Sequence, residues 1–565
     1  MVVMNGFVDF HDGKWRVSDL KPHVSLRFKD VFKGIQFGAT PPFDLRDRPS
    51  FAADLDWFMQ RYPLSLTEDA QSRLSDQLKT YADLQDRVAE LKRPDYRPSI
   101  KPGFKAPEEA EDYQIRAAEM LRSTGSLLLL DDVGLGKTVS FLASVADGWG
   151  LPAAVVVQPH LSSQWVKEYI ERFTHLTAFE VKDRKVRDLP PADIYLFRYS
   201  NIAAWADYAA TLGVKTVCFD EIQELRHGTG RQHGSGTAKG LGAQAFCDAA
   251  QYRIGLTATP IYNYGSEIWN VVEFIAPGSL GSWYEFVINW CTSHGTHWIV
   301  KDPAALGAFL VDEGIALRRT NDDPEVSRTL PPLSKVITQV GWNEGDADTN
   351  RELQQRLAQR ILAGSFHERG QAARELDVML RQETGIAKAR AVAAYVRTLV
   401  EAGEPVLLAG WHRGVYDIWL DTLSDLNPVM FTGSESQPQK RRAKEAFLTG
   451  QSPLMIMSLR SGAGLDGLQH VCRHVVYGEL DWSPQVHTQF TGRVRRRGQQ
   501  QPVTAHFLHV DGGSDPVVMS TLGLKASQSH GILNPFADME AATPLDDTRM
   551  RKLAKAVLEG SHDAQ

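Results

Sequence analysis

Short apolar runs alternate with longer helical patterns in two separate parts of the chain. The first series lies within residues 110–278 and contains the runs SLLLL, AAVVV, DIYLF, TVCF and YRIGL. The second lies within residues 401–525 and contains PVLLAGW, PVMF, PLMIM, HVVYG and TAHFLHV. Apolar runs of this length, separated by helices, are typical of parallel strands that are covered on both faces. The pattern predicts two tandem α/β domains.

The other parts of the chain differ from these two series. Residues 1–105 mix short alternating segments with a polar helical stretch, Glu68 to Leu91, and end in a linker rich in Pro and Lys. They predict a small α+β accessory domain. Residues 279–400 are mainly helical in pattern and predict a helical bridge or insertion between the two α/β domains. Residues 526–565 predict a polar C-terminal extension with one helix, Asp546 to Leu558.

The composition excludes several classes of protein. It is 43% hydrophobic and 23% charged, which is ordinary for a globular protein and excludes wholesale disorder, collagen-like and coiled-coil chains. No apolar stretch approaches the length of a membrane span, and the N-terminus has no secretory pattern. The four cysteines are widely spaced, without a C-x-x-C pair. We therefore expect a cytoplasmic protein with free thiols, no membrane contact and no structural zinc.

The formal net charge of −7 is unusual for a nucleic-acid-binding protein, whose domains are often strongly basic. Screening limits the reach of each charge to about 8–10 Å at physiological salt. A local basic track is therefore sufficient for nucleic-acid binding, and the net charge does not exclude it.

The sequence DDVGLGKT, Asp131 to Thr138, follows the apolar run SLLLL and precedes a helical pattern. Gly134 and Gly136 let backbone N–H groups approach phosphate oxygens, Lys137 supplies a positive charge, and the Thr138 hydroxyl is a ligand for Mg²⁺. The order of strand, loop and helix predicts a phosphate-binding loop. A plain strand-to-helix turn is the alternative, because Asp131 stands where the strict pattern has glycine.

An acidic pair, Asp220 and Glu221, ends the apolar run TVCF. A carboxylate at this position can hold Mg²⁺, and its neighbour can orient or activate the attacking water. Acidic pairs after strands are common, but the alternating α/β context favours the functional interpretation.

Four arginines lie within Arg493 to Arg497 in the second α/β series. Arg493 and Arg496 are three residues apart and would share one face if the segment is helical. They are candidates for arginine fingers that reach the γ-phosphate, and a basic surface patch is the alternative.

Together these motifs resemble, in the family's own order, the Swi/Snf-type ATP-dependent DNA translocases of helicase superfamily two. The resemblance covers roughly residues 112–525. Asp131 is the normal residue in the family's D-E-x-G-L-G-K-T motif. Further matching segments are EDYQIRAA, VVVQPHLSSQWVKEY, DEIQ, GLTATPIYNYGSEIWNVVEFIAP, IALRRT, MSLRSGAGLDGLQ, ELDWSP and QFTGRVRRRGQ.

The resemblance implies two RecA-like lobes with ATP and Mg²⁺ in the cleft between them. Lys137 and Glu221 would act from one side as catalytic residues, and Arg493 and Arg496 from the other. Thr138 and Asp220 would hold the metal. The remaining nucleotide-binding residues that it implies are Gln114, which would read adenine, Gly134, Leu135, Gly136 and Gln489.

Two segments leave alternatives open. The loop ELRHGTGRQHGSGTAKG after DEIQ is either a surface insertion or a DNA contact through Arg226, Arg231 and Lys239. The N-terminal domain, with Lys21 and Lys29 among aromatic residues, is either a DNA-structure-recognition module or an accessory domain without DNA contact.

The function that these observations favour is an ATPase that translocates on double-stranded DNA, in a compact bacterial or phage-like member of the family. One alternative is a helicase that separates strands. The other is an ATP-gated DNA-binding subunit that serves a partner nuclease, methylase or polymerase.

Overall fold

The computed structural model describes residues 4–519 and Ala554, apart from residues 33–34, 36–37, 231–235, 262–265, 295–296, 322, 328–329, 344–350, 364–365 and 460–464. The chain divides into two compact units. The first comprises Met1–Leu130 with Lys137–Arg318, and the second comprises Asp131–Gly136 with Arg319–Gln565.

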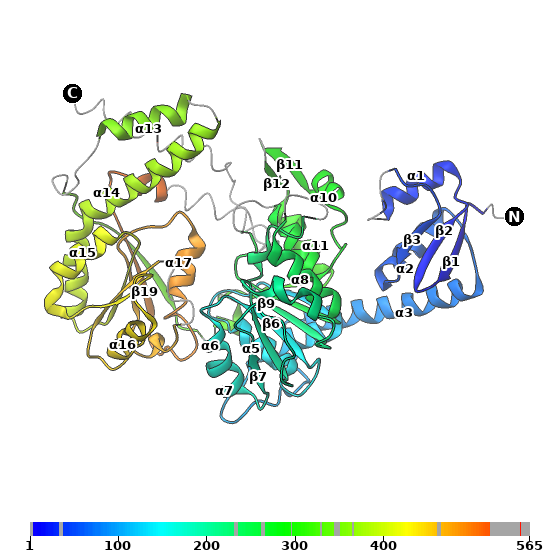
Figure 1. Ribbon diagram of the computed structural model, residues 1–565, viewed down its shortest axis with the longest axis horizontal. Helices are drawn as coiled ribbons and strands as arrows, with labels where there is room; N and C mark the ends of the chain where they lie inside the picture. Colours follow the sequence, from blue (N-terminus) through cyan, green and yellow to red (C-terminus); the bar gives the residue numbers. More distant parts are fainter. Residues whose placement is uncertain are drawn as a thin grey trace. The chain divides into compact units, whose positions relative to one another are not determined.

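The N-terminal part of the first unit is a small α+β domain, as the sequence predicts (Figure 1). Its four-stranded sheet has the order β3-β2-β1-β4, in which β4 is parallel to β1 and the other pairs are antiparallel. An aromatic core that includes Trp15, Phe28 and Phe58 lies under the sheet. The elements are β1 (Phe7–His11), β2 (Lys14–Ser18), α1 (Pro22–Val31), β3 (Phe43–Arg46), α2 (Pro49–Arg61) and β4 (Ser65–Leu66).

A 24-residue helix, α3 (Glu68–Leu91), follows this domain at the bounds that the sequence predicts. It begins where the Thr67 side chain accepts a hydrogen bond from the Ala70 N–H, and Glu68 and Asp69 in its first turn complement the helix dipole. The helix packs against α2 and against α4 (Asp112–Thr124), so it joins the N-terminal domain to the parallel-sheet part of this unit.

That parallel-sheet part, which we call the first lobe, contains a seven-stranded sheet of order β13-β5-β10-β9-β6-β8-β7. Every pair in it is parallel. The strands are β5 (Ser126–Leu129), β6 (Ala153–Val157), β7 (Ala178–Glu180), β8 (Ile194–Arg198), β9 (Thr216–Asp220), β10 (Tyr252–Leu256) and β13 (Ala316–Leu317).

Both faces of this sheet are buried, which explains the continuous apolar runs. Leu127 and Leu129 pack with Phe141 of α5 (Lys137–Val145) on one face. On other strands, Phe197 contacts Phe246 of α8 (Ala238–Ala249), and Phe219 contacts Phe274 of α9 (Glu267–Ile275). The doubly covered parallel sheet confirms the predicted α/β class.

The second unit contains a second lobe with a six-stranded sheet of order β14-β19-β18-β15-β17-β16, again with every pair parallel. Its strands are β14 (Leu333–Gln339), β15 (Val406–Gly410), β16 (Val429–Phe431), β17 (Leu454–Ser458), β18 (His474–Tyr477) and β19 (Val503–His509). Its helices include α13 (Arg351–Ala363), α14 (Phe366–Glu401), α15 (Arg413–Thr422), α16 (Gln437–Leu448) and α17 (Pro484–Thr491).

The stretch 279–400 is not only helical, in contrast to the expectation. It contains α10 (Trp283–Trp290), α11 (Pro303–Asp312), α13 and most of α14, but also a hairpin, β11 (Cys291–His294) with β12 (His297–Val300). In addition, β13 joins the sheet of the first lobe and β14 joins that of the second. The sequence of β14 does not indicate a strand, because the residues of this edge strand are exposed or half-buried and include no continuous apolar run.

The four cysteines are free and buried. Among the described residues, no helix has both the length and the apolar character that crossing a membrane requires. The helix expected at Asp546 to Leu558 lies outside the described residues, except for Ala554.

Candidate nucleotide-binding site

The predicted phosphate-binding loop connects β5 to α5 in the order that the sequence indicates. Gly134 and Gly136 have φ angles of 92° and 71°. This left-handed region is accessible at low cost only to glycine, so both residues are required by the path of the chain. α5 begins at Lys137 and also contains Thr138 in its first turn, so the loop leads directly into a helix N-terminus, where phosphate groups are favoured.

Asp131, at the first position of the loop, forms a buried ion pair with Arg319. Arg319 Nε donates to Asp131 Oδ1 over 2.8 Å, and Nη2 donates to Oδ2. The Arg319 backbone N–H also donates to Oδ1 over 3.0 Å. Asp131 is completely buried, and its pairing with Arg319 explains why an aspartate and not a glycine occupies this position. The sequence places Arg319 in the IALRRT segment but does not indicate this partner.

Asp220 and Glu221 follow β9 at the same edge of the sheet as the loop, because the carboxyl ends of parallel strands meet there. Asp220 Oδ2 accepts a hydrogen bond from Trp165 Nε1 over 2.8 Å. Its backbone oxygen accepts one from the Tyr199 hydroxyl over 2.9 Å. Trp165 belongs to the segment VVVQPHLSSQWVKEY, whose resemblance to the family marks it without saying what it contacts.

Burial, together with the charge of Glu221, raises the pKa of Asp220 to about 7. The Trp165 hydrogen bond and the charge of Lys137 act in the opposite direction. Lys137 therefore lies close enough to Asp220 to act on it electrostatically. A divalent cation beside the carboxylate would favour its ionised form. The donor set of Asp220 and the Thr138 hydroxyl is suited to Mg²⁺, which prefers oxygen ligands.

The backbone of Glu221 is strained. Its φ and ψ are both 55°, in the left-handed region that residues other than glycine rarely occupy. Gln223 Nε2 donates to Glu221 Oε2 over 2.6 Å and holds the side chain. Such strain is concentrated at functional sites, where the surrounding structure enforces one orientation.

Gln114 is buried in the first turn of α4, where its Oε1 accepts a hydrogen bond from the Glu111 N–H over 3.0 Å. This contact gives Gln114 a capping role in the helix. Its reading of adenine stays a prediction.

The arginines of QFTGRVRRRGQ are not on a helix, so the condition for a shared helical face is not met. α17 ends at Thr491, and Arg493 and Arg496 lie in the turns that follow it. Arg496 Nη1 donates to Asp466 Oδ1 over 2.7 Å. Burial alone would raise the pKa of Asp466, but Arg496 and neighbouring donors outweigh it and hold that pKa below its usual value.

The predicted residues fall into both units. Lys137, Thr138, Asp220 and Glu221 are in the first unit. Arg493, Arg496 and the half-buried Gln489 are in the second, together with Gly134, Leu135 and Gly136. The predicted meeting of the two arginines with Lys137 and Glu221 across a cleft stays a prediction.

The basic loop after DEIQ is partly engaged within the first lobe. Lys239 Nζ donates to Glu224 Oε2 over 2.6 Å, and Arg226 Nη1 donates to the Gln223 backbone oxygen over 3.3 Å. Arg231 lies outside the described residues. These contacts favour a structural role for Arg226 and Lys239.

The family model of the SNF2-related domain matches residues 53–388, more than half of the chain. The chain belongs to the SNF2-related family. This membership confirms the resemblance that the motifs carry.

Relatives in this family are distant in sequence. The chain is 24% identical over 455 residues to DNA annealing helicase and endonuclease ZRANB3 of Mus musculus, covering 75% of this chain and 41% of that protein. It is 24% identical over 454 residues to the uncharacterized ATP-dependent helicase YqhH of Bacillus subtilis, covering 73% of this chain and 76% of that protein. The chain spans 41% of the length of the Mus musculus protein, and 40% and 52% of the length of further relatives from Xenopus laevis and Drosophila melanogaster.

A solved structure, the SWI2/SNF2 ATPase core of Sulfolobus solfataricus in complex with double-stranded DNA, is also similar. It is 21% identical, with a TM-score of 0.37, over 78% of this chain and 99% of that one.

Proposed function

We propose that this protein is an ATP-hydrolysing motor of the SNF2-related family that moves along double-stranded DNA. The observation that carries the proposal is the placement of Lys137 and the Asp220–Glu221 pair at one edge of the first lobe, where the charge of Lys137 acts on Asp220. Family membership supports the same conclusion, and relatives in the family carry the names ATP-dependent helicase and DNA annealing helicase.

The phosphate-binding loop and residues of the first lobe divide the work of nucleotide binding. The loop through Gly134, Leu135 and Gly136 presents backbone N–H groups to the phosphates, and Lys137 adds a positive charge. Thr138 and Asp220 hold Mg²⁺, which neutralises charge on the phosphate oxygens when it is bound.

Hydrolysis requires an oriented water molecule and stabilisation of the developing charge. Glu221, whose orientation is set by its strained backbone and by Gln223, accepts the proton of the attacking water. Arg493 and Arg496 stabilise charge in the transition state, an effect of about 10³–10⁵ in rate in comparable enzymes. Gln114 and Gln489 complete the contacts to the nucleotide.

The central test is the variant Glu221→Gln. We expect loss of DNA-stimulated ATP hydrolysis with retained nucleotide binding, because the amide keeps the shape of the site but cannot accept the proton. Glu224→Gln is a matched control on the same segment, since Glu224 pairs with Lys239, and it should hydrolyse ATP like the wild type. A hydrolysis rate that no nucleic acid changes would contradict the proposal.

A second experiment separates translocation from the alternatives. Displacement of a triplex-forming strand from a blunt duplex is expected of a double-strand translocase. Unwinding of a fork without triplex displacement would favour a strand-separating helicase instead. A stable co-purifying nuclease, methylase or polymerase, with no movement by the isolated chain, would favour an ATP-gated subunit.

A further inference from the structure

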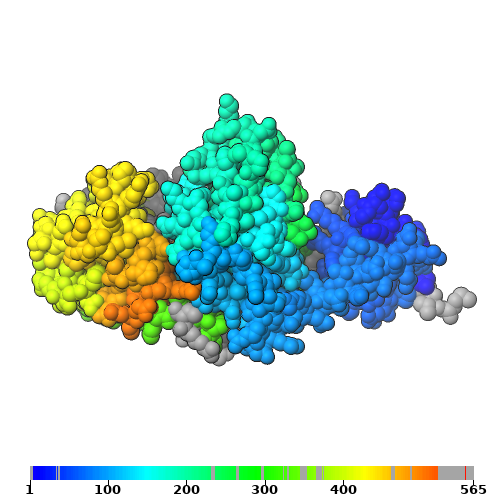
Figure 2. Space-filling model, turned by 90° about the horizontal axis from the view of Figure 1, so that it is seen from below, coloured from blue at the N-terminus to red at the C-terminus, as the bar shows by residue number. Residues whose placement is uncertain are grey.

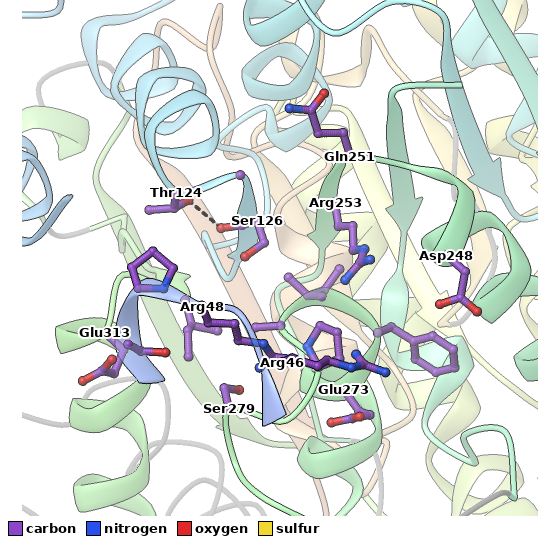
Figure 3. A pocket seen from close by; sticks show the side chains of 18 of the residues that line it. Arg46, Arg48, Thr124, Ser126, Asp248, Gln251, Arg253, Glu273, Ser279 and Glu313 are labelled. Carbon is purple, nitrogen blue, oxygen red and sulfur yellow. Dashed lines mark hydrogen bonds between the residues drawn. The ribbon is translucent and has the colours of Figure 1, made fainter. Parts of the chain in front are cut away.

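A cavity of about 840 Å³ lies within the first unit, between the N-terminal domain and the first lobe (Figure 3). Its wall includes Thr124 and Ser126 at the start of β5 and Arg253 at the start of β10. All strands of this sheet are parallel, so these amino ends lie at the edge opposite to Lys137 and Asp220. The cavity is therefore distinct from the nucleotide site.

The N-terminal domain contributes two arginines to the cavity, Arg46 and Arg48. They flank Asp47 in an extended segment, where neighbouring side chains point to opposite sides. The Asp47 carboxylate is engaged inside the N-terminal domain, where it accepts hydrogen bonds from Trp15 Nε1 over 2.9 Å and from Arg73. The charge of Asp47 is therefore directed away from its two neighbours.

Arg253 and Glu273 face these arginines from the first lobe, and Figure 3 shows the four side chains in one region of the cavity. Arg48 comes close to the lobe, since a methyl group on Gly278 would lie 3.3 Å from Arg48 Nη1. Burial, and then the charge of Arg46, lowers the pKa of Arg48, while Glu273 acts in the opposite direction.

Arg46, Arg48 and Arg253 share a single carboxylate, that of Glu273. Within the described part of the chain, the side chains of Arg46 and Arg48 make no hydrogen bond or close ion pair. Glu273 is held by the Gly278 N–H, which donates to its Oε2 over 2.8 Å. Two further acids, Asp248 and Glu313, lie at different sides of the cavity (Figure 3). Asp47 also belongs to the lining, so three arginines and four acids line the cavity, and positive charge is in excess only where the three arginines meet Glu273.

We propose that this cavity binds a phosphate group through Arg46, Arg48 and Arg253. Guanidinium groups pair with phosphate through two parallel hydrogen bonds, and several of them match its multiple oxygens. The volume is that of a small-ligand site. The same chemistry is offered by a backbone phosphate of DNA and by a free phosphate compound. Since the two arginines belong to the N-terminal domain, a bound phosphate would hold that domain against the first lobe. Figure 2 shows the blue surface of the N-terminal part continuing onto the cyan surface of the lobe.

The test compares the full chain with the double variant Arg46→Gln, Arg48→Gln, without nucleotide. Two probes are used: inorganic pyrophosphate, read as a rise in Tm, and a labelled DNA duplex, read by anisotropy over a range of salt concentrations. If the phosphate belongs to DNA, the slope of log Kd against log salt falls by about 1–2 in the double variant. If it is a free phosphate compound, the rise in Tm with pyrophosphate is reduced instead. Arg61→Gln, at the other end of α2 and outside the cavity, is the matched control.

A variant that is expected to strengthen binding controls for effects of misfolding. Asp248→Asn removes a negative charge from the rim, so it should strengthen binding of the probe that the double variant weakens. Loss of stability cannot imitate a gain in affinity. The proposal is overturned if the salt slope and the pyrophosphate effect are both the same in wild type and double variant, or if Asp248→Asn weakens binding. Neither readout uses ATP hydrolysis, so this result is independent of the proposed motor activity.

Discussion

Single residues support the proposed nucleotide site through an ion pair and hydrogen bonds inside the protein. Asp131 and Arg319 are both buried and joined by paired hydrogen bonds. Trp165 donates to Asp220, and Gln223 donates to Glu221. None of these three supporting residues contacts nucleotide in the proposed mechanism, yet each sets the position of a residue in the loop or in the acidic pair.

Replacement of Arg319 by Leu should strongly destabilise the protein. It leaves the Asp131 carboxylate buried without its partner, a change that typically costs about 3–5 kcal/mol. The free energy of unfolding, measured by urea denaturation, checks this, and nucleotide affinity should fall because the loop loses its anchor. Arg16→Gln breaks the exposed pair with Asp44 and should cost less than about 1 kcal/mol. Equal effects of the two substitutions would show that the buried pair has no special role.

At the scale of elements, close approach of helices to strands depends on small residues. Trp419 of α15 lies against Gly410, at the end of β15, and Gly478, just after β18. A Cβ on Gly478 would come within 2.4 Å of Trp419 Cζ2, and one on Gly410 within 2.7 Å of Cζ3. The Trp419 indole N–H donates to the Ala389 oxygen of α14, so the ring cannot move without breaking this bond.

Gly478→Ala should therefore destabilise the second lobe by about 1–3 kcal/mol, the usual cost of overpacking a core. Thermal unfolding followed by far-UV circular dichroism would report it. Gly433→Ala is the control, since a Cβ there meets no atom within 4 Å and its φ is not in the left-handed region. An unchanged thermal unfolding temperature for Gly478→Ala would mean that α15 can shift without loss of stability.

Strands β18 and β19 bring the half-buried His474 and the buried His506 together in the second lobe. His474 Nδ1 and His506 Nε2 are 3.0 Å apart, and the Tyr395 hydroxyl is 2.9 Å from His506 Nδ1. Burial, and then the neighbouring His474, lowers the pKa of His506 to about 4. Burial also lowers the pKa of His487 to about 4.

The stability of the second lobe should decrease as the pH falls from about 6.5 to about 4. In this window the unfolded chain binds protons at these histidines and the folded chain does not, so protonation favours unfolding. The lowered pKa of His506 corresponds to about 3 kcal/mol, present above pH 6.5 and lost on acidification. Tm measured against pH should show a shallower fall for His506→Gln. His11→Gln, at an exposed position, is the control. If the dependence of Tm on pH is unchanged in His506→Gln, the contribution assigned to His506 is contradicted.

At the scale of the whole molecule, the acidic net charge of −7 coexists with local concentrations of arginine. One lies at Arg493–Arg497 in the second lobe, and another lines the cavity of the first unit. Because screening confines each charge to its surroundings, the sign of the whole chain does not decide what such a track binds.

DNA affinity should therefore fall steeply with salt in spite of the acidic chain. A protein that contacts several backbone phosphates loses roughly 10³-fold or more in affinity between 50 and 200 mM salt. Anisotropy titrations of a labelled duplex at four salt concentrations would measure the slope. Affinity that is independent of salt would show that phosphate contacts do not dominate binding.

The amino-acid sequence alone determined the fold class, the loop from Gly134 to Thr138 and the acidic pair after β9. Each of these is a property of a contiguous segment: apolar runs that need two covered faces, glycines that permit positive φ, and acids at the end of a strand. It also predicted the long helix α3 at its observed bounds. It could not show the edge strand β14, which has no continuous apolar run, or the turns that carry Arg493 and Arg496.

Only the tertiary structure decided which distant residues meet. Asp131 and Arg319 are 188 positions apart, and Trp165 and Asp220 are 55 apart. Arg46 and Arg48 reach Arg253 across an even longer stretch of chain. No periodicity links such positions, because their pairing depends on the order of strands in the sheet and on where α3 joins the N-terminal domain to the first lobe.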